Sequence, residues 1–162
     1  MDKYKLTIDT YNKSAKSFQD KFMNMDLYND TYDKFCKSIV VNKAEIFEIA
    51  CGPGNITKYL LTKRPDFKIT AIDLSPKMLE LAKANNPTVD FQLMDCRDID
   101  KLDKKFDAIM CGFCLPYLSR EESANLISDS AKLLKGNGLI YISTMEGDYE
   151  KSGFETTSFS GQ

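Results

Sequence analysis

The sequence predicts an α/β protein with a doubly wound, mainly parallel sheet and additional helices at the N-terminus. Short runs of β-branched and aromatic residues recur from residue 45 onward, and amphipathic segments with helical spacing separate them. Strands that alternate with helices pair in parallel through right-handed crossovers, which places helices on both faces of the sheet. The chain has 162 residues, of which 43% are hydrophobic, enough for one core but too few for two. We therefore expect a single domain.

The N-terminal segment has the spacing of helices. Apolar and aromatic side chains recur three and four positions apart, and they are Tyr11, Ala15, Phe18, Phe22, Tyr28, Tyr32, Phe35 and Ile39. We expect two or three helices up to residue 41. Five later segments have the length and composition of buried strands, namely 46–50, 67–73, 89–93, 106–111 and 139–144.

Two helices between these strands carry start and stop signals. Ser75 precedes Pro76, which is the arrangement of an N-cap residue followed by proline at the first helical position. Ser119 and Glu122 have the spacing of a capping box. We expect the first of these helices to end at residues 85–87, Asn-Asn-Pro, and the second at Gly136.

The last segment, 145–162, is polar and too short for another strand, helix and strand. The expected sheet therefore has five strands, and strand 139–144 leaves an edge that is able to pair. We expect either the tail, through residues 154–159, or a second copy of the chain in a homodimer to cover this edge.

Composition excludes several classes of function. Lys and Arg total 22 against 24 Asp and Glu, a net charge of −2 that does not favour nucleic-acid binding. No apolar stretch reaches the roughly 20 residues that cross a bilayer, and the N-terminus lacks the pattern of a secretory signal, so we expect a cytoplasmic protein without a membrane span. An odd set of cysteines suits reduced thiols, and these are Cys36, Cys51, Cys96, Cys111 and Cys114. The Cys111-x-x-Cys114 spacing fits a redox pair or half of a zinc site, but the sequence has no second cysteine pair and no histidine to complete a metal site, and buried thiols that line a pocket are the favoured interpretation.

The strongest local signal is a glycine-rich turn between the first strand and the next helix. It reads Glu48-Ile-Ala-Cys-Gly-Pro-Gly54. Ligands of parallel sheets bind beyond the carboxyl ends of the strands, and glycine lets the backbone approach them closely. The turn therefore predicts a nucleotide-type site, the alternative being a tight turn without a ligand.

Acidic residues follow or end three of the predicted strands. Asp73 lies 19 residues after Gly54, where a carboxylate can accept the hydroxyls of a ribose. Glu48 would repel a pyrophosphate, and Thr57 stands where a dinucleotide-binding motif has its third glycine. With Asp95, three carboxylates at neighbouring strand tips favour a positively charged ligand. Asp95 alone is equally compatible with a helix cap or a surface turn.

Five blocks in order carry a resemblance to a known family. They are Glu48-Ile-Ala-Cys-Gly-Pro-Gly54, Ala71-Ile-Asp-Leu-Ser-Pro-Lys-Met-Leu79, Met94-Asp95, Phe106-Asp107 and Leu133-Leu-Lys-Gly-Asn-Gly138. Over about residues 11–144 the sequence resembles the class I S-adenosylmethionine-dependent methyltransferases. The resemblance implies a Rossmann-like fold, truncated after the fifth strand because the family has seven. It divides the chain into N-terminal helices that close over the cofactor (1–44), a cofactor-binding core (45–144) and a polar tail (145–162).

The resemblance also implies a role for particular residues. Asp73 would hold the ribose hydroxyls, Leu74 would lie against the adenine, and Asp95 with the amide of Cys96 would contact the adenine edge. Backbone around Ala50 and Gly52, helped by Glu48, would bind the methionine ammonium. The full set of implied cofactor-binding residues is Tyr11, Glu48, Ala50, Cys51, Gly52, Gly54, Asp73, Leu74, Met78, Asp95, Cys96 and Cys111.

The expected function is methyl transfer from S-adenosyl-L-methionine to a small-molecule acceptor that enters near residues 111–117. Displacement at a sulfonium methyl requires mainly alignment of the reacting atoms, and the chain has no histidine, so no catalytic residue is assigned. A non-catalytic S-adenosylmethionine-binding domain is the first alternative, because the last two strands and a general base are missing. A nicotinamide-dependent oxidoreductase is the second, because it would share the acid at Asp73.

Overall fold

A computed structural model of the chain describes residues 3–148 and residue 151. Five parallel strands form one sheet in the order β3-β2-β1-β4-β5. The strands are β1 (Glu45–Ile49), β2 (Lys68–Asp73), β3 (Asp90–Leu93), β4 (Phe106–Gly112) and β5 (Leu134–Ser143). The predicted fold class, a doubly wound parallel sheet with N-terminal helices, is confirmed.

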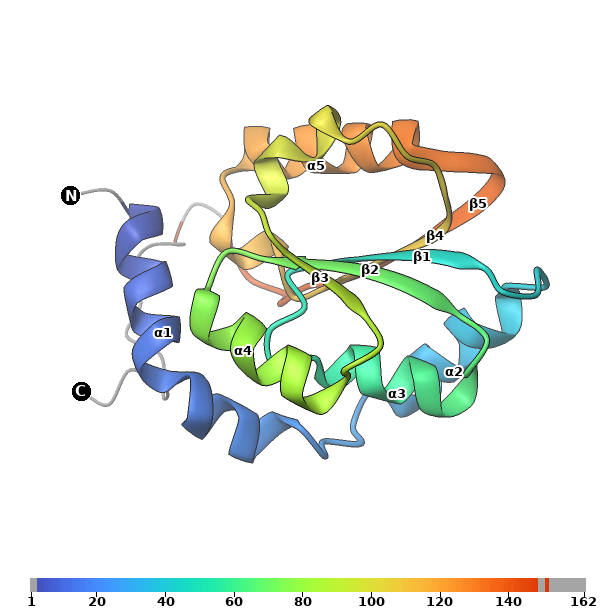
Figure 1. Cartoon of the computed structure of the whole chain (residues 1–162). Coiled ribbons are helices and arrows are strands. Elements are labelled where there is room, and N and C mark those ends of the chain that lie inside the picture. Colours follow the sequence, from blue (N-terminus) through green and yellow to red (C-terminus); the bar gives the residue numbers. More distant parts are fainter. Residues whose placement is uncertain (1–2, 149–150, 152–162) are drawn as a thin grey trace.

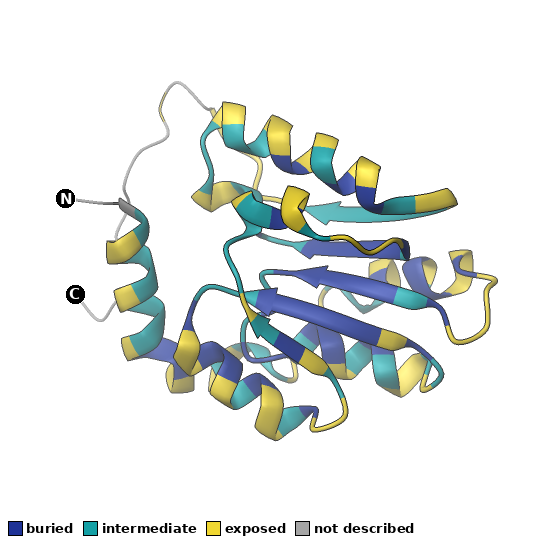
Figure 2. Ribbon diagram, turned by 45° about the horizontal axis from the view of Figure 1, so that its top comes forward, coloured by how far each residue is buried: buried dark blue, intermediate teal, exposed yellow. Residues whose placement is uncertain are grey.

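Helices cover both faces of the sheet (Figure 1). The face below the sheet carries α2 (Asn29–Ser38), α3 (Asn55–Lys63) and α4 (Pro76–Asn85), and the opposite face carries α5 (Arg120–Leu133) and the short 3-10 helix η1 (Cys96–Lys101). A second 3-10 helix, η2 (Leu115–Tyr117), follows β4. The remaining helix, α1 (Lys3–Phe22), stands across the carboxyl ends of the strands, whose arrowheads point toward it in Figure 2. Among the described residues, no helix combines the length and apolarity that crossing a bilayer requires.

Alternation along β1 divides the core into two layers. Ile46 packs under α2, α3 and α4, whereas Phe47 and Ile49 pack against α5 and η1. In the second layer the rings of Phe47 and Phe106 stack with centroids 4.9 Å apart. A central strand buried on both faces explains why this segment reads as a nearly continuous apolar run.

The predicted helix starts are confirmed. The Ser75 hydroxyl accepts the backbone N–H of Met78 at 3.2 Å, with Pro76 at the first helical position. Ser119 and Glu122 form a reciprocal capping box, in which the Glu122 carboxylate accepts the Ser119 N–H at 2.7 Å. Each cap satisfies an amide that the first helical turn leaves without a partner.

The predicted boundary between the last helix and the last strand is wrong by several residues. The helix α5 ends at Leu133, before Gly136, and β5 begins at Leu134 instead of residue 139. Leu134 is extended and pairs with Phe106, and a register shift follows before Ala108 pairs with Leu139. Pairing with β4 therefore overrides the glycine stop signal at this point. The edge of β5 has no further strand among the described residues, and the proposed covering segment 154–159 lies outside them.

Candidate functional site

A cavity of about 780 Å³ lies between α1 and the carboxyl ends of the strands, since residues of both line it. Its walls come from α1, the turn after β1, the ends of β2 and β3, and the loop after β4. The predicted site residues that line it are Tyr11, Ala50, Cys51, Gly52, Asp73, Leu74, Met78, Asp95 and Cys96. Tertiary structure therefore gathers most of the predicted site around one cavity. Glu48, Gly54 and Cys111 are not among its lining residues.

The glycine-rich turn adopts left-handed backbone conformations at three positions. Ala50 has φ 57°, Gly52 has φ 55° and Gly54 has φ 77°. Such angles are easy for glycine and strained for alanine, so surrounding contacts must hold Ala50 in place. One of these contacts is a hydrogen bond in which the Gly52 N–H donates to Asp73 Oδ2 at 2.8 Å. Among the described residues, a side chain at Gly52 would have only a ring atom of Phe18 within 4 Å, at 3.8 Å, so the backbone is open on this side.

Gly54 is required for packing rather than for access to the cavity. A Cβ atom there would lie 2.5 Å from Asn86 Nδ2 and 3.3 Å from Ala82 Cα, both belonging to the end of α4. The two asparagines that end this helix also hold the turn. Asn85 donates to the carbonyl of Pro53 at 2.8 Å, and Asn86 donates to that of Gly54 at 3.0 Å. Sequence reasoning treated these asparagines only as a helix stop and missed this role.

Asp73 lies at the end of β2, and its carboxylate is half-buried in the cavity wall. Its Oδ2 accepts the Gly52 N–H, and its Oδ1 accepts the Ser75 N–H at 2.8 Å. Burial raises its pKa, although these backbone donors oppose the shift. A carboxylate oxygen can accept more than one hydrogen bond, so both oxygens keep capacity for a further donor. Asp73 is thus a fixed acceptor in the cavity wall.

Glu48 lies beneath the turn instead of at the cavity wall. Alternation in β1 points its side chain toward α3, where the Thr57 hydroxyl donates to Oε2 at 2.5 Å. The residue is only 1% exposed, and Oε1 has no hydrogen-bond partner among the described residues. Burial raises the pKa of Glu48 to about 8, and the negative charge of Asp73 adds to the shift. Thr57, seen in the sequence as a missing glycine, is therefore the partner of this acid.

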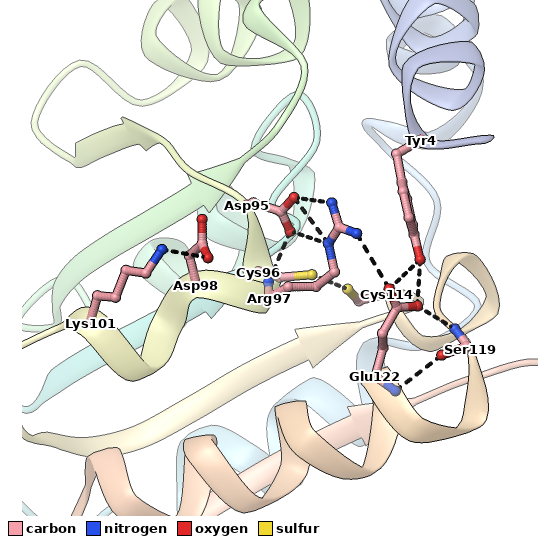
Figure 3. Close-up of polar contacts among 9 residues, drawn as sticks. All are labelled: Tyr4, Asp95, Cys96, Arg97, Asp98, Lys101, Cys114, Ser119 and Glu122. Carbon is pink, nitrogen blue, oxygen red and sulfur yellow. Dashed lines mark hydrogen bonds and ion pairs between the residues drawn. The ribbon is translucent and has the colours of Figure 1, made fainter. Parts of the chain in front are cut away.

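Asp95 has a cationic partner from its own chain (Figure 3). The Arg97 guanidinium contacts both carboxylate oxygens, with Nη2 2.5 Å from Oδ2. Asp95 also caps η1 by accepting the Arg97 N–H at 2.9 Å, the alternative that the sequence left open. Hydrogen bonding to Arg97 lowers the pKa of Asp95. The three carboxylates therefore do not share one position: Asp73 and Asp95 line the cavity, and Glu48 lies below it.

Arg97 connects this strand tip to α1 and α5 (Figure 3). Its guanidinium lies 3.7 Å from the ring centroid of Tyr4 and 3.3 Å from a carboxylate oxygen of Glu122. The Tyr4 hydroxyl donates to the same carboxylate. These contacts fasten the first turns of α1 over one end of the cavity. Sequence reasoning missed Arg97 and Tyr4, because their partners are remote in the chain.

A tyrosine pair holds the middle of α1. The hydroxyls of Tyr11 and Tyr117 are hydrogen-bonded, and their rings meet edge-on with centroids 5.6 Å apart. Tyr11 also contacts the Phe18 ring at 5.8 Å. Burial is the main reason that the pKa values of both tyrosines are raised. Both phenols therefore stay neutral at ordinary pH and can exchange hydrogen bonds at the cavity wall.

The cavity continues away from Asp73 and Asp95 toward the loop before α2 and the loop after β4. The lining residues also include Lys58 and a set of apolar or aromatic side chains, among them Phe22, Met25, Leu27, Tyr28, Phe113 and Met145. The rings of Tyr28 and Phe113 pack with centroids 5.0 Å apart. One cavity thus has an acidic end and a largely apolar end.

Comparison with known proteins decides the family. Residues 46–138, more than half of the chain, match the family described as a methyltransferase domain. The chain belongs to this methyltransferase family. A malonyl-[acyl-carrier protein] O-methyltransferase of Acetivibrio thermocellus is 27% identical over 130 residues, covering 75% of this chain and 45% of that protein. A demethylmenaquinone methyltransferase of Thermotoga maritima is 29% identical over 102 residues, covering 63% of this chain and 44% of that protein.

Solved structures agree with this assignment. The amino pentose methyltransferase CalS10 of Micromonospora echinaspora, solved with bound S-adenosylmethionine, superimposes with a TM-score of 0.58 and 26% identity. The match covers 68% of this chain and 46% of that one. The chain spans about half the length of the curated relatives it matches.

Proposed function

We propose that this chain is the cofactor-binding part of an S-adenosylmethionine-dependent methyltransferase that acts on a small-molecule acceptor. The observation that carries the proposal is the position of Asp73, a half-buried carboxylate fixed against the glycine-rich turn in the wall of a large cavity. Family membership and the cofactor named for CalS10 support the same assignment.

The residues present fit this cofactor. Asp73 retains acceptor capacity on both oxygens, which suits the two hydroxyls of a ribose. Leu74 and Met78 supply apolar surface in the adjoining wall for the adenine. The backbone at Gly52 is accessible, and the carboxylate of Asp73 favours the cationic methionine end. Glu48 lies below this end and adds its negative charge only above a pH of about 8. When bound, the cofactor supplies a methyl group activated on a cationic sulfur.

Asp95 and Cys96 complete the proposed cofactor site. Asp95 and the amide of Cys96 contact the adenine edge, and Arg97 fixes the orientation of the Asp95 carboxylate. The N-terminal helix α1 covers the site and excludes water through Tyr4 and Tyr11. In this proposal residues 1–44 form the cover, and residues 45–144 form the binding core.

The contribution of the chain to methyl transfer is alignment. Holding the acceptor in line with the methyl group and leaving sulfur accounts for most of the rate enhancement that such a displacement needs. Tyr11 and Tyr117 are neutral phenols with raised pKa values, so they position groups through hydrogen bonds instead of removing a proton as a general base. No residue of this chain is assigned as a general base.

The largely apolar end of the cavity is the proposed acceptor site. Its aromatic and methionine side chains favour an uncharged acceptor with substantial apolar surface. The loop after β4, which carries Phe113, contributes to this end. We infer that the acceptor enters here.

Calorimetric titration with S-adenosylhomocysteine and S-adenosylmethionine tests the cofactor assignment. Binding of either, without binding of NAD, is the expected result. NAD binding alone would establish the oxidoreductase alternative, and no affinity for any of the three would overturn the cofactor assignment. Transfer of a labelled methyl group to a fractionated metabolite pool then tests turnover, since binding without transfer supports the non-catalytic alternative.

We also propose that the protein is cytoplasmic, binds no nucleic acid and forms a homodimer. A cytoplasmic location and the lack of a nucleic-acid partner rest on the composition and the weak net charge. A homodimer through the free edge of β5 rests on the pairing capacity of an edge strand. Light scattering after size-exclusion chromatography tests the dimer, and a monomer at all concentrations would contradict it.

A further inference from the structure

Three cysteines from separate parts of the chain meet beside the cavity. Cys96 begins η1, Cys111 lies in β4, and Cys114 precedes η2. The Cys114 thiol donates a hydrogen bond to the sulfur of Cys96, with 3.7 Å between the two sulfurs (Figure 3). Cys96 and Cys114 both line the cavity, and Cys114 is only 3% exposed. The spacing in the sequence draws attention to Cys111 and Cys114, and the fold brings Cys96 next to Cys114 as a third member of the cluster.

The backbone around each cysteine decides which pair can form a disulfide. Two bonded sulfurs are about 2.05 Å apart, so Cys96 and Cys114 must approach by roughly 1.7 Å. Neither residue belongs to a strand, because Cys96 begins η1 and Cys114 precedes η2, so their approach does not require sheet pairing to break. Cys111 belongs to the same core layer as Cys114, but it pairs with Ile49 on one side and with Ile142 on the other. The sheet therefore restrains Cys111 more strongly than either loop restrains the other two cysteines.

We propose that Cys96 and Cys114 form a peroxide-sensitive pair that closes to a disulfide in the cavity wall. Cys96 is partly exposed and reacts first: its thiolate attacks hydrogen peroxide, which breaks the O–O bond and leaves a sulfenic acid and hydroxide. The Cys114 sulfur then displaces the sulfenic hydroxyl, which leaves as water. In total, two thiols lose two electrons and two protons, and one peroxide becomes two waters.

Closure of the pair has a consequence that rests on the proposed function. The disulfide pulls the N-terminal end of η1 toward the loop after β4, which moves Asp95 and the amide of Cys96 relative to Asp73. We expect oxidation to lower the affinity for S-adenosylhomocysteine at least fivefold, and a dithiol reductant to restore it. Peroxide would thus switch off cofactor binding reversibly.

Peptide mapping tests the bond without reference to the cofactor. The full chain is treated with hydrogen peroxide, free thiols are alkylated, and the protein is digested with trypsin. Cleavage separates Cys96, in peptide 84–97, from Cys111 and Cys114, which share peptide 106–120. The expected product is a cross-link between these two peptides that persists in C111S and disappears in C96S and in C114S. The variant C36S is a matched control, because Cys36 lies in α2 and is not part of the cavity wall.

Each other product of the mapping overturns the proposal. A bond inside peptide 106–120 would assign the pair to Cys111 and Cys114. Cross-links between chains, or sulfinic acid at Cys96 without a cross-link, would show that Cys114 does not resolve the oxidised thiol. If C114S does not fold, the C111S variant still decides the matter, because it leaves Cys114 as the single cysteine in peptide 106–120.

Titration of oxidised and reduced protein with S-adenosylhomocysteine tests the consequence. For the natural sequence, the reduced form should bind at least five times more tightly than the oxidised form. For C96S the two affinities should be equal. A ratio of one for the natural sequence, with the cross-link present, would overturn the switch. If neither form binds while the cross-link forms, the proposed function fails and the disulfide assignment stands.

Discussion

The carboxylate of Asp73 accepts the backbone N–H of Gly52 at 2.8 Å, joining the tip of β2 to the turn after β1. The residue proposed to bind the ribose therefore also sets the conformation of the turn proposed to bind the methionine end. Removing this acceptor would therefore affect both the binding of the ligand and the stability of the fold. Substitutions at this position must separate them.

Asp73→Asn should weaken binding of S-adenosylhomocysteine at least tenfold, because hydrogen bonds to a charged group contribute about 1.5 to 3 kcal/mol. The amide keeps one accepting oxygen for the turn, so the melting temperature should fall less than in Asp73→Ala. Calorimetry and thermal melting measure the two effects. Asp20→Asn is the matched control, since Asp20 pairs with Lys16 on the surface of α1. Equal affinities for Asp73→Asn and Asp20→Asn would refute the ribose assignment.

Glu48 should make the protein less stable as the pH rises from about 4.5 to about 8. Its pKa is raised from an ordinary value of 4.5 to about 8 by burial, so the folded state holds this proton more tightly than the unfolded state. The destabilisation is absent below pH 4.5, grows between the two values and is complete above pH 8, where it amounts to a few kcal/mol.

Glu48→Gln should remove this slope, because the amide has no charge to bury. Urea unfolding of both proteins between pH 5 and 9 measures the difference. Above pH 8 the variant should be the more stable of the two. Parallel pH profiles for the two proteins would mean that Glu48 does not carry the shifted proton.

Gly54→Ala should destabilise the fold by about 2 to 4 kcal/mol, since it combines a left-handed φ of 77° with contacts that are too close. The added methyl would lie 2.5 Å from Asn86 Nδ2 and 3.3 Å from the backbone of Ala82. Gly136→Ala is the matched control, because no other part of the described structure lies within 4 Å of its added Cβ. Chemical denaturation compares them, and a loss below 0.5 kcal/mol for Gly54→Ala would contradict the packing role.

Tyr4→Phe should loosen the first turns of α1 while leaving the core intact. The change keeps a ring beside Arg97 but removes the hydroxyl that donates to Glu122. Hydrogen exchange followed by mass spectrometry should show faster exchange in the first half of α1, with little change in the strands. Tyr59→Phe is the control, because its hydroxyl joins α3 to Asp33 of α2. Identical α1 exchange in both variants would show that Tyr4 does not fasten the cover.

Local signals accounted for most of the fold. The β-branched runs, the cap at Ser75 and the capping box at Ser119 and Glu122 act between residues close in the chain, and all appear where the sequence placed them. The end of α5 was misplaced because Leu134 pairs with Phe106, a partner 28 residues away. Non-local pairing outweighed the local preference of Gly136.

The candidate site was only partly accessible to sequence reasoning. Asp73 and the glycine-rich turn follow from strand ends meeting at one edge of a parallel sheet, so their shared position was predictable. The orientation of Glu48 was not, because one step along β1 decides whether a side chain faces α3 or the opposite layer. The pairing of Asp95 with Arg97 was equally hidden, since it depends on side-chain direction.

The order of strands and helices, the capping residues and the edge of the sheet that carries the site follow from the sequence alone, because each depends on neighbouring residues or on the general rules of parallel sheets. Only the tertiary structure decides that Thr57 partners Glu48, and that Cys114 meets Cys96 rather than Cys111 alone. These contacts join separate elements, and the cost of burying polar groups without partners selects them only once the chain has folded.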